Sequence, residues 1–177
     1  MKITLKHIVP KAVTIGISLW LILSLGCNPF APRLAPDALS QEDVLGDPRT
    51  LDGFFLLFKN AYELRDSSLY GRLFSNDFTF AYYDFELGQE VSWDRATELN
   101  LSYNLFLSIE QINLDWNYFP PPDTTDTEAF VVRNFNLTIR ENEETEFVGT
   151  GRARLRLRRS AIGQPWKAYY WFDDSDF

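Results

Sequence analysis

Histidine and cysteine, two side chains that commonly carry enzyme chemistry, are nearly absent from this 177-residue chain. It has one histidine, His7, and one cysteine, Cys27, and both lie near the N-terminus. Histidine triads, thiol nucleophiles and zinc sites built from Cys and His all need these side chains. Beyond residue 27, acid–base chemistry is left to Asp, Glu, Tyr, Lys, Arg, Ser and Thr. No carboxylate spacing matches an EF-hand loop, so we predict neither a metal site nor a cofactor.

The surroundings of Cys27 indicate where the protein resides. The stretch "MKITLKHIVPK" carries three lysines and no acid, and the apolar "AVTIGISLWLILSLG" follows it. A basic stretch, a short apolar stretch and small residues before a cleavage site are typical of a secretory signal peptide. The residues "SLGC" resemble the lipobox of bacterial lipoproteins, in which the cysteine is acylated and becomes the mature N-terminus. Ser24 stands where the lipobox usually has Leu, and an ordinary cleavage that leaves a free thiol is the alternative.

This resemblance implies a lipid-anchored protein of the bacterial cell envelope. Residues 1–26 are then the signal peptide, the proline-rich residues 27–47 a tether, and residues 48–177 the folded domain. An ordered arm packed on the domain is the alternative for the tether. Asn28 after the cysteine favours the outer membrane, with the domain facing the periplasm.

The charge of the mature chain limits its partners. Removing residues 1–26 takes away three of 17 basic residues and none of 25 acidic ones, which leaves a net charge of −11. This charge argues against nucleic acid and against adhesion to an anionic membrane surface. The expected partners are the membrane through the lipid anchor, an envelope protein or a small apolar ligand, and a second copy of the chain.

Three helices are predicted in the first half of the domain. Apolar residues recur at helical spacing over residues 48–64, with Asp47 as N-cap and Pro48 as the first helical residue. Asp66 caps a second, short helix, and "SWDRATELNLSYNLFL" predicts a third helix with Ser92 as its cap. The expected apolar face of this third helix consists of Trp93, Ala96, Leu99, Tyr103 and Phe106.

The remaining segments alternate with a period of two residues, as β-strands do. The predicted strands are "DFTFAYY", "IEQINLDWNYF", "EAFVVRNFNLTIRE", "TEFVGTGRARLRLRR" and "PWKAYYWFDD". The last four follow the helices as successive antiparallel strands. Helices gathered against one face of an antiparallel sheet define an α+β domain.

Two motifs extend this prediction to a known family. "AYELRDSSLYGRLFSNDFTF" and the closing "WKAYYWFD" resemble the nuclear transport factor 2-like, or cystatin-like, domain, although Ala168 stands where the closing pattern has Ile. The resemblance covers residues 48–173 and implies a curved antiparallel sheet wrapped around about three helices, with a conical pocket. The family includes ketosteroid isomerases, SnoaL-like polyketide cyclases, dehydratases and non-catalytic binding modules, so the resemblance specifies a fold and leaves the function open.

The long hairpin is predicted to have a turn of odd length. Such a turn places the apolar Phe135 and Leu137 on the same face as Gly149 and Gly151, and the buried face decides the register. The opposite face then carries a ladder of four arginines, namely Arg152, Arg154, Arg156 and Arg158. The ladder is either a solvated outer face, with stems over aromatic rings and some charges paired to acids, or a docking face for an anionic partner such as a lipid headgroup or an acidic protein.

Several residues are candidates for the pocket. If the alternation holds, Arg133 lies on the inner face and needs a carboxylate partner, whereas a bulge would turn it outward. The carboxylates considered for Arg133 are Asp84, Asp115 and Asp173. The aromatic residues considered for the pocket mouth, or alternatively for the plain core, are Tyr82, Tyr103, Trp116 and Trp171.

Two functions of different class follow from these residues. Ketosteroid isomerases use an aspartate base and a tyrosine-containing oxyanion hole, and the resemblance implies Asp84 or Asp115 with Tyr82 or Tyr103 in those roles. The missing histidine, the lipid anchor and the apolar interior favour a non-catalytic ligand-binding or assembly domain, with an isomerase- or cyclase-like enzyme as the alternative. An enclosed pocket with an Asp and a Tyr that face one void would favour the enzyme, and a filled core would favour the binding domain.

Overall fold

The computed structural model describes residues 40, 44–117 and 120–175. The predicted signal peptide and Cys27 therefore lie outside the described residues. The helices are α3 (Leu51–Glu63), α4 (Ser67–Arg72) and α5 (Arg95–Ser108). The strands are β1 (Phe74–Asp84), β2 (Gln89–Asp94), β3 (Gln111–Trp116), β4 (Asp123–Thr124), β5 (Glu128–Arg140), β6 (Glu146–Arg158) and β7 (Lys167–Asp173). Within the described residues, no helix has the length and apolar character needed to span a membrane.

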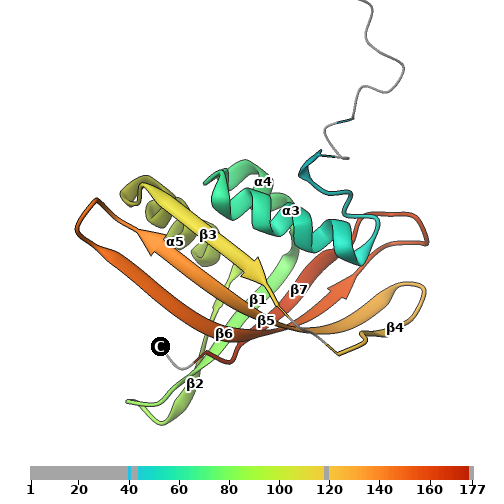
Figure 1. Cartoon of the computed structure of the whole chain (residues 1–177). Helices are drawn as coiled ribbons and strands as arrows, with labels where there is room; N and C mark the ends of the chain where they lie inside the picture. Colours follow the sequence, from blue (N-terminus) through green and yellow to red (C-terminus); the bar gives the residue numbers. More distant parts are fainter. Residues whose placement is uncertain (1–39, 41–43, 118–119, 176–177) are drawn as a thin grey trace, which may run out of the picture. The chain divides into compact units, whose positions relative to one another are not determined.

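A single bent sheet carries the three helices on one of its faces (Figure 1). The strand order is β2-β1-β7-β6-β5-β3, with the short β4 paired to β5. The α+β prediction is confirmed, but the sheet is mixed, because β1 and β7 pair in parallel while the other neighbours are antiparallel. The closing strand β7 thus lies in the middle of the sheet, between β1 and β6.

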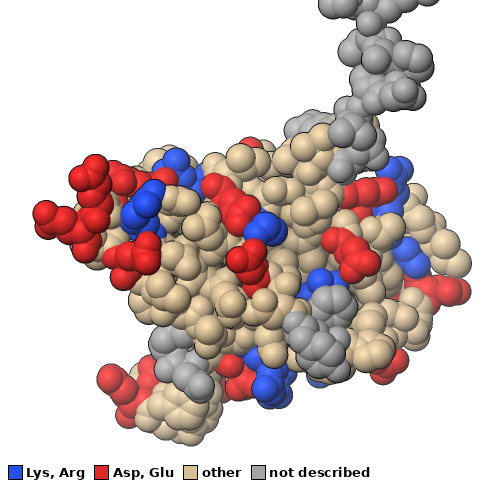
Figure 2. Space-filling view, in the orientation of Figure 1, with Lys and Arg blue, Asp and Glu red and all other residues tan. Residues whose placement is uncertain are grey.

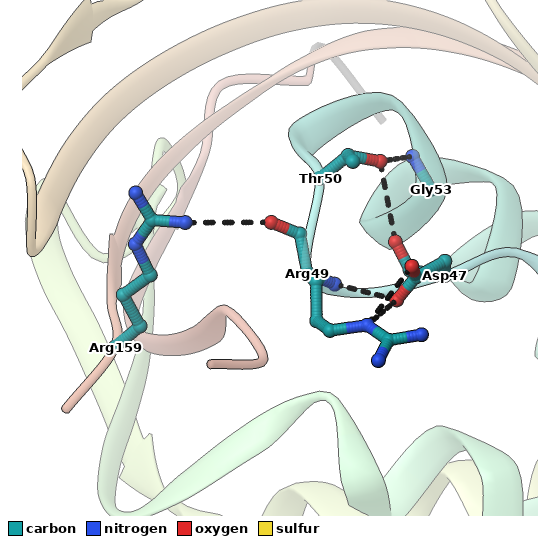
Figure 3. A network of polar contacts seen from close by, with 5 residues as sticks. All are labelled: Asp47, Arg49, Thr50, Gly53 and Arg159. Atoms are coloured by element: carbon teal, nitrogen blue, oxygen red, sulfur yellow. Dashed lines mark hydrogen bonds and ion pairs between the residues drawn. The ribbon is translucent and has the colours of Figure 1, made fainter. Parts of the chain in front are cut away.

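The start of α3 differs from the prediction. Thr50, and not Asp47, is the N-cap: its hydroxyl accepts a hydrogen bond from the Gly53 amide at 3.0 Å and donates to the Asp47 carbonyl (Figure 3). The Asp47 carboxylate instead binds the amide and guanidinium of Arg49. Pro48 is therefore part of the turn before the helix. Gly53 is required there, because a Cβ at this position would lie 1.9 Å from the Asp47 carbonyl oxygen.

The short helix α4 begins as predicted, since the Asp66 carboxylate accepts hydrogen bonds from the Ser68 and Leu69 amides. The third helix was predicted to begin too early. Ser92 and Trp93 belong to β2, where Trp93 pairs with Phe80 of β1. The alternation of Val91 and Trp93 stabilises a strand here, and the helix starts after its cap. That cap is Asp94, which accepts from the Thr97 amide at 2.9 Å.

The hairpin of β5 and β6 has the predicted register. Residues 141–145 form an odd-length turn, and Phe135 pairs with Gly151 across the strands. A Cβ on Gly151 would lie 2.6 Å from the Phe135 ring and 2.7 Å from the Ser175 Cβ. Glycine at this position therefore makes room for the large ring opposite it.

One residue of β7 interrupts its alternation. The pairing of β6 with β7 shifts register between Arg156 and Leu157, so that Tyr169 is the extra residue of a bulge. Ala168 and Trp171 are both buried as a result, although they are three positions apart and simple alternation would put them on opposite faces. Asp173, two residues further, points to the same side as Trp171 and lines the interior with it.

The last residues of the predicted tether are ordered where they are described. Leu45 packs against the core, and its carbonyl accepts a hydrogen bond from the Asn60 side chain at 3.0 Å. Gly46 has a φ of 108°, and a Cβ there would collide with the backbone of α3. Residues 44–46 therefore fit the alternative of an arm packed on the domain.

A candidate ligand cavity

An open cavity lies between helices α3 and α5 and the inner face of the sheet. Its volume is about 340 Å³. The aromatic members of its wall are Phe58, Tyr62, Phe80, Trp93, Trp116, Phe135 and Trp171. The other members are Glu98, Leu101, Ser102, Leu105, Leu114, Leu137 and Asp173. The space between the helices and the inner face of the sheet thus contains this cavity, and the packed core fills the rest of it.

The aromatic wall is held by ring–ring contacts at varied angles. Trp93 stacks on Phe80 with ring centroids 4.5 Å apart, and Trp171 meets Phe80 edge-on at 5.0 Å. Across the cavity, Phe58 makes edge contacts with Trp116 at 5.3 Å and with Trp171 at 5.4 Å. Offset and edge-on pairs of this kind add about 0.5–1.5 kcal/mol each beyond their buried area. The rings therefore form a preorganised wall.

Glu98 anchors the polar part of this wall. The side chain is 5% exposed and accepts three hydrogen bonds, each from a different direction. Tyr70 donates to its Oε1 at 2.6 Å, and Ser102, one turn further along α5, donates to the same oxygen at 3.0 Å. The Trp93 indole Nε1 donates to Oε2 at 2.7 Å. This carboxylate consequently ties α4, α5 and β2 together.

Two tyrosines lie beside this carboxylate. The rings of Tyr62 and Tyr70 meet edge-on with centroids 5.1 Å apart. Burial, and to a lesser degree the nearby Glu98 carboxylate, raises the pKa of Tyr62 above its usual range. Burial is also the main reason that the pKa of Tyr70 lies well above its usual range. Both phenols therefore keep their protons at neutral pH, and Tyr70 donates its proton to the Glu98 carboxylate.

Asp173 supplies the second carboxylate of the wall. It reaches the cavity because of the bulge at Tyr169, and the Ser175 hydroxyl donates a hydrogen bond to it. Burial is the main reason that the pKa of Asp173 is raised, and the neighbouring Asp174 and Glu98 charges act in the same direction. The fold thus disfavours the negative charge of Asp173.

The Trp171 indole Nε1 has no hydrogen-bond partner among the described residues, although the side chain is buried. A buried donor without an acceptor costs about 1–3 kcal/mol. Trp171 is therefore held in the wall by the packing of its ring against Phe58 and Phe80 and not by a polar contact.

The structure brings only some of the predicted pocket residues together. Trp116 and Trp171 lie in the cavity wall. Tyr82 and Asp84 line an adjacent hollow of about 520 Å³, whose wall also includes Phe80, Trp93 and Asp173. The Asp84 carboxylate there accepts hydrogen bonds from the amides of the turn between β1 and β2.

Tyr103 and Asp115, both predicted for the pocket, lie outside it. Tyr103 is half exposed, because α5 turns Glu98 and Ser102 inward and presents Tyr103 to solvent. Asp115 is on the outward side of β3 and forms an ion pair with Lys59 at 2.9 Å. The suggested pairing of Asp84 or Asp115 with Tyr82 or Tyr103 as an active site is therefore wrong for Tyr103 and Asp115.

Arg133 faces inward, as the simple alternation predicts, but its partner is a different carboxylate. Its guanidinium forms an ion pair with Asp52 at 3.0 Å and lies 3.9 Å from the centre of the Phe55 ring. Burial lowers the pKa of Arg133, and Asp52 opposes that effect. Arg133 is thus part of the contact between β5 and the start of α3, away from the cavity.

The arginine ladder faces outward. Arg154, Arg156 and Arg158 lie over aromatic rings of β7, at 5.9 Å from Phe172, 5.8 Å from Tyr170 and 5.0 Å from Tyr169. Asp174 pairs with Arg152 and Arg154, and Asp77 pairs with Arg158. These contacts are those expected of a solvated outer face. Docking of an anionic partner on the ladder stays a prediction.

Sequence reasoning did not find Glu98, Ser102, Tyr62, Tyr70 or Trp93 as site residues. The available signal was the spacing of Glu98, Ser102 and Phe106, which recur every four residues and so share one helix face.

Among the described residues, no group of three or more His, Cys, Asp or Glu side chains is arranged to hold a metal ion.

Comparison with solved structures finds the same architecture at low sequence identity. A putative scytalone dehydratase from Novosphingobium aromaticivorans matches with a TM-score of 0.61 and 14% identity, over 73% of this chain and 83% of that one. LinA matches with a TM-score of 0.55 and 9% identity, over 70% and 82%. A nuclear transport factor 2-like superfamily protein from Salmonella enterica matches with a TM-score of 0.54 and 16% identity, over 69% and 85%.

No protein-family model matches the sequence, and no curated protein does. The likeness therefore rests on the path of the chain, which agrees with these structures although few residues do. The described domain has the nuclear transport factor 2-like cone fold.

Proposed function

We propose that this domain binds a small, mostly apolar ligand in the cavity between α5 and the sheet, within a protein that Cys27 tethers to the cell envelope. The observation that carries the proposal is the cavity itself. It is open and about 340 Å³ in volume, within the range of small-molecule sites, and aromatic and aliphatic side chains form most of its wall. A few polar groups converge at one end, which is the usual arrangement for orienting such a ligand.

The polar end also defines what kind of contact a ligand would make. Glu98 is already bound by three protein donors, so its main role is to hold the wall in place. Asp173 has one hydroxyl partner and remains available as an acceptor. A ligand with an apolar body and one donor group would therefore satisfy this cavity.

A specific observation favours a second candidate function. Tyr62 and Asp173 both line the cavity, so an Asp and a Tyr face one void as the enzyme hypothesis requires, although this cavity is open and not enclosed. A protonated Tyr62 would stabilise a developing oxyanion, and Asp173, whose pKa is raised by burial, would accept a proton more readily than an exposed Asp does. Scytalone dehydratase is the activity assigned to one neighbour of this fold, so an isomerase- or dehydratase-like reaction is the alternative for this chain.

Occlusion of the cavity tests the binding proposal. Leu101 is 47% exposed in the cavity wall, and Leu107, on the same helix, is 68% exposed and does not line the cavity. We expect Leu101→Trp to weaken binding of the neutral fluorescent compound N-phenyl-1-naphthylamine by at least about tenfold, because the indole fills the mouth. Leu107→Trp adds the same group elsewhere and should bind as the unmodified protein does. Equal binding by both variants would contradict the proposal.

The fate of a copurified ligand separates binding from catalysis. The protein would be isolated from native membranes, and mass spectrometry would identify what stays bound. A binding domain returns this ligand unchanged after incubation in heavy water. Conversion, or deuterium uptake that is lost in Asp173→Asn but kept in the exposed control Asp126→Asn, would establish the enzyme instead.

A further inference from the structure

The cavity wall contains two carboxylates and no basic side chain. Glu98 and Asp173 are its charged members, and the described lining includes neither lysine nor arginine. The hydrogen-bond partners of both carboxylates are neutral: tyrosine, tryptophan and serine. Among the described residues, the ion pairs of the domain lie elsewhere, as at Lys59, Arg133 and Arg158. The interior is therefore an acidic, aromatic compartment without an internal counterion.

The negative charge of the two carboxylates in this cavity is not compensated by a positive charge in its wall. Removing a carboxylate from water is costly unless a positive charge or several donors compensate for it. Glu98 has donors from three residues, whereas the hydrogen bonds to Asp173 come from Ser175, through its hydroxyl and its backbone, and the pKa of Asp173 is raised all the same. The two acidic side chains also lie close enough that the charge of Glu98 acts on Asp173. A cation placed between them would relieve both effects.

The rings around the same space provide a second kind of contact for a cation. The face of an aromatic ring is negative, and tryptophan has the strongest attraction for a cation within about 6 Å. Trp93, Trp116 and Trp171 all line the cavity, at different angles to Phe58 and Phe80. A wall of rings at crossed angles surrounds a bulky cation on several sides, as recognition of quaternary ammonium groups requires.

We propose that the ligand of this cavity is a small organic cation, a substituted ammonium with an apolar body, whose charged head lies between the tryptophan rings and the Asp173 carboxylate. This inference rests on the proposed function, because it names the class of ligand for the same cavity. It differs from binding of a neutral apolar ligand in requiring the positive charge. Anionic ligands are excluded by the same two carboxylates.

A pair of isosteric compounds tests the requirement for charge. Phenyltrimethylammonium and tert-butylbenzene have nearly the same shape, and one carries a positive charge. Calorimetric titration at neutral pH and physiological salt should show the cation binding at least about tenfold more tightly. Equal or tighter binding of tert-butylbenzene would overturn the proposal.

Three variants locate the effect and separate it from attraction to an acidic surface. Asp173→Asn keeps the shape of the side chain and should reduce the preference for the cation at least about fivefold, whereas the exposed Asp126→Asn makes the same charge change and should not. Leu101→Trp should block both compounds.

If tert-butylbenzene binds as well as the cation and Leu101→Trp blocks it, the proposed function stands and this inference fails. If neither compound binds, or if Leu101→Trp leaves cation binding unchanged, both fail.

Discussion

Glu98 is the residue on which the geometry of the cavity depends most. It is the common acceptor for Tyr70 from α4, Ser102 from α5 and Trp93 from β2, and all three donors are brought to it by different elements. An acceptor-only side chain satisfies three donors without conflict. Glu98 lies in the first turn of α5, and its burial follows from the tertiary structure alone.

We expect Glu98→Gln to destabilise the domain by about 2–3 kcal/mol. The amide NH₂ of glutamine would replace one acceptor oxygen and oppose a buried donor, which loses a hydrogen bond and leaves that donor unsatisfied. Urea unfolding measures this loss. The exposed Glu110→Gln is the control and should stay within about 0.5 kcal/mol. A loss of that small size for Glu98→Gln would show that the carboxylate is dispensable.

The contribution of Asp173 to the stability of the fold should depend on pH in a direction that its pKa shift determines. Its pKa is raised in the fold by burial and by the Asp174 and Glu98 charges, with Ser175 opposing. The folded state therefore binds the proton more tightly than the unfolded state, and the contribution of Asp173 to stability falls as the pH rises between the unfolded and folded pKa values. Asp173→Asn should consequently raise the melting temperature at pH 7, and this gain should vanish below about pH 3.8, the ordinary value for Asp. Melting curves across this range would contradict the assignment if the gain were absent at pH 7 or persisted in acid.

At the scale of elements, the hairpin of β5 and β6 shows a packing constraint that a single glycine relieves. Gly151→Ala would place a Cβ 2.6 Å from the Phe135 ring, so the strands or the ring must shift. Overpacking of this kind costs about 1–3 kcal/mol. Chemical unfolding should show that loss, while Val148→Thr, at an exposed position of the same strand, should change stability little. Unchanged stability of Gly151→Ala would mean that the strands separate more easily than this packing implies.

The parts of the fold that follow simple periodicity were predictable from the sequence. The register of the hairpin follows from alternation and the buried face, and Asp66 marks the start of α4 by its side-chain chemistry. β2 was missed because "VSWD" reads equally well as the start of a helix. The bulge at Tyr169 was missed because one extra residue changes the facing of Asp173 without any signal in the residue types. The cavity depends on both features, so most of its residues could not be predicted from the sequence.

At the scale of the whole molecule, charge is unevenly distributed. The β5–β6 hairpin carries Glu141, Glu143 and Glu144 in its turn and Glu146 at the start of β6, and Figure 2 shows acidic side chains gathered at this end of the molecule. Basic side chains are scattered over the same face, and some of them lie directly beside these acidic side chains (Figure 2). The ladder of β6 is on the outer side of the sheet, where its arginines are paired with acids and rings. The net charge of −11 over residues 27–177 argues against adhesion of the domain surface to an anionic membrane, so the proposed attachment to the membrane depends on Cys27.

We expect the mature protein to begin at an acylated Cys27. The motif "SLGC" after a short apolar stretch motivates this prediction. Mass spectrometry of the membrane fraction should find an N-terminal cysteine with its acyl chains, and Cys27→Ser should lose both the modification and the stable attachment. Ser24→Leu, which brings the motif closer to the lipobox, should keep both. A mature N-terminus with a free thiol would contradict the prediction.

The position of β7 determines when the sheet can be completed during folding. Because the last strand lies between β1 and β6, the sheet consists of two unconnected pieces until residues 167–173 have been synthesised. The piece β1–β2 and the piece β3–β5–β6 each present an open edge during that time, and pairing across long sequence separations is slow. The sheet of this domain is completed only after residues 167–173 have been synthesised, and loss of these residues would leave two half-sheets in place of one domain.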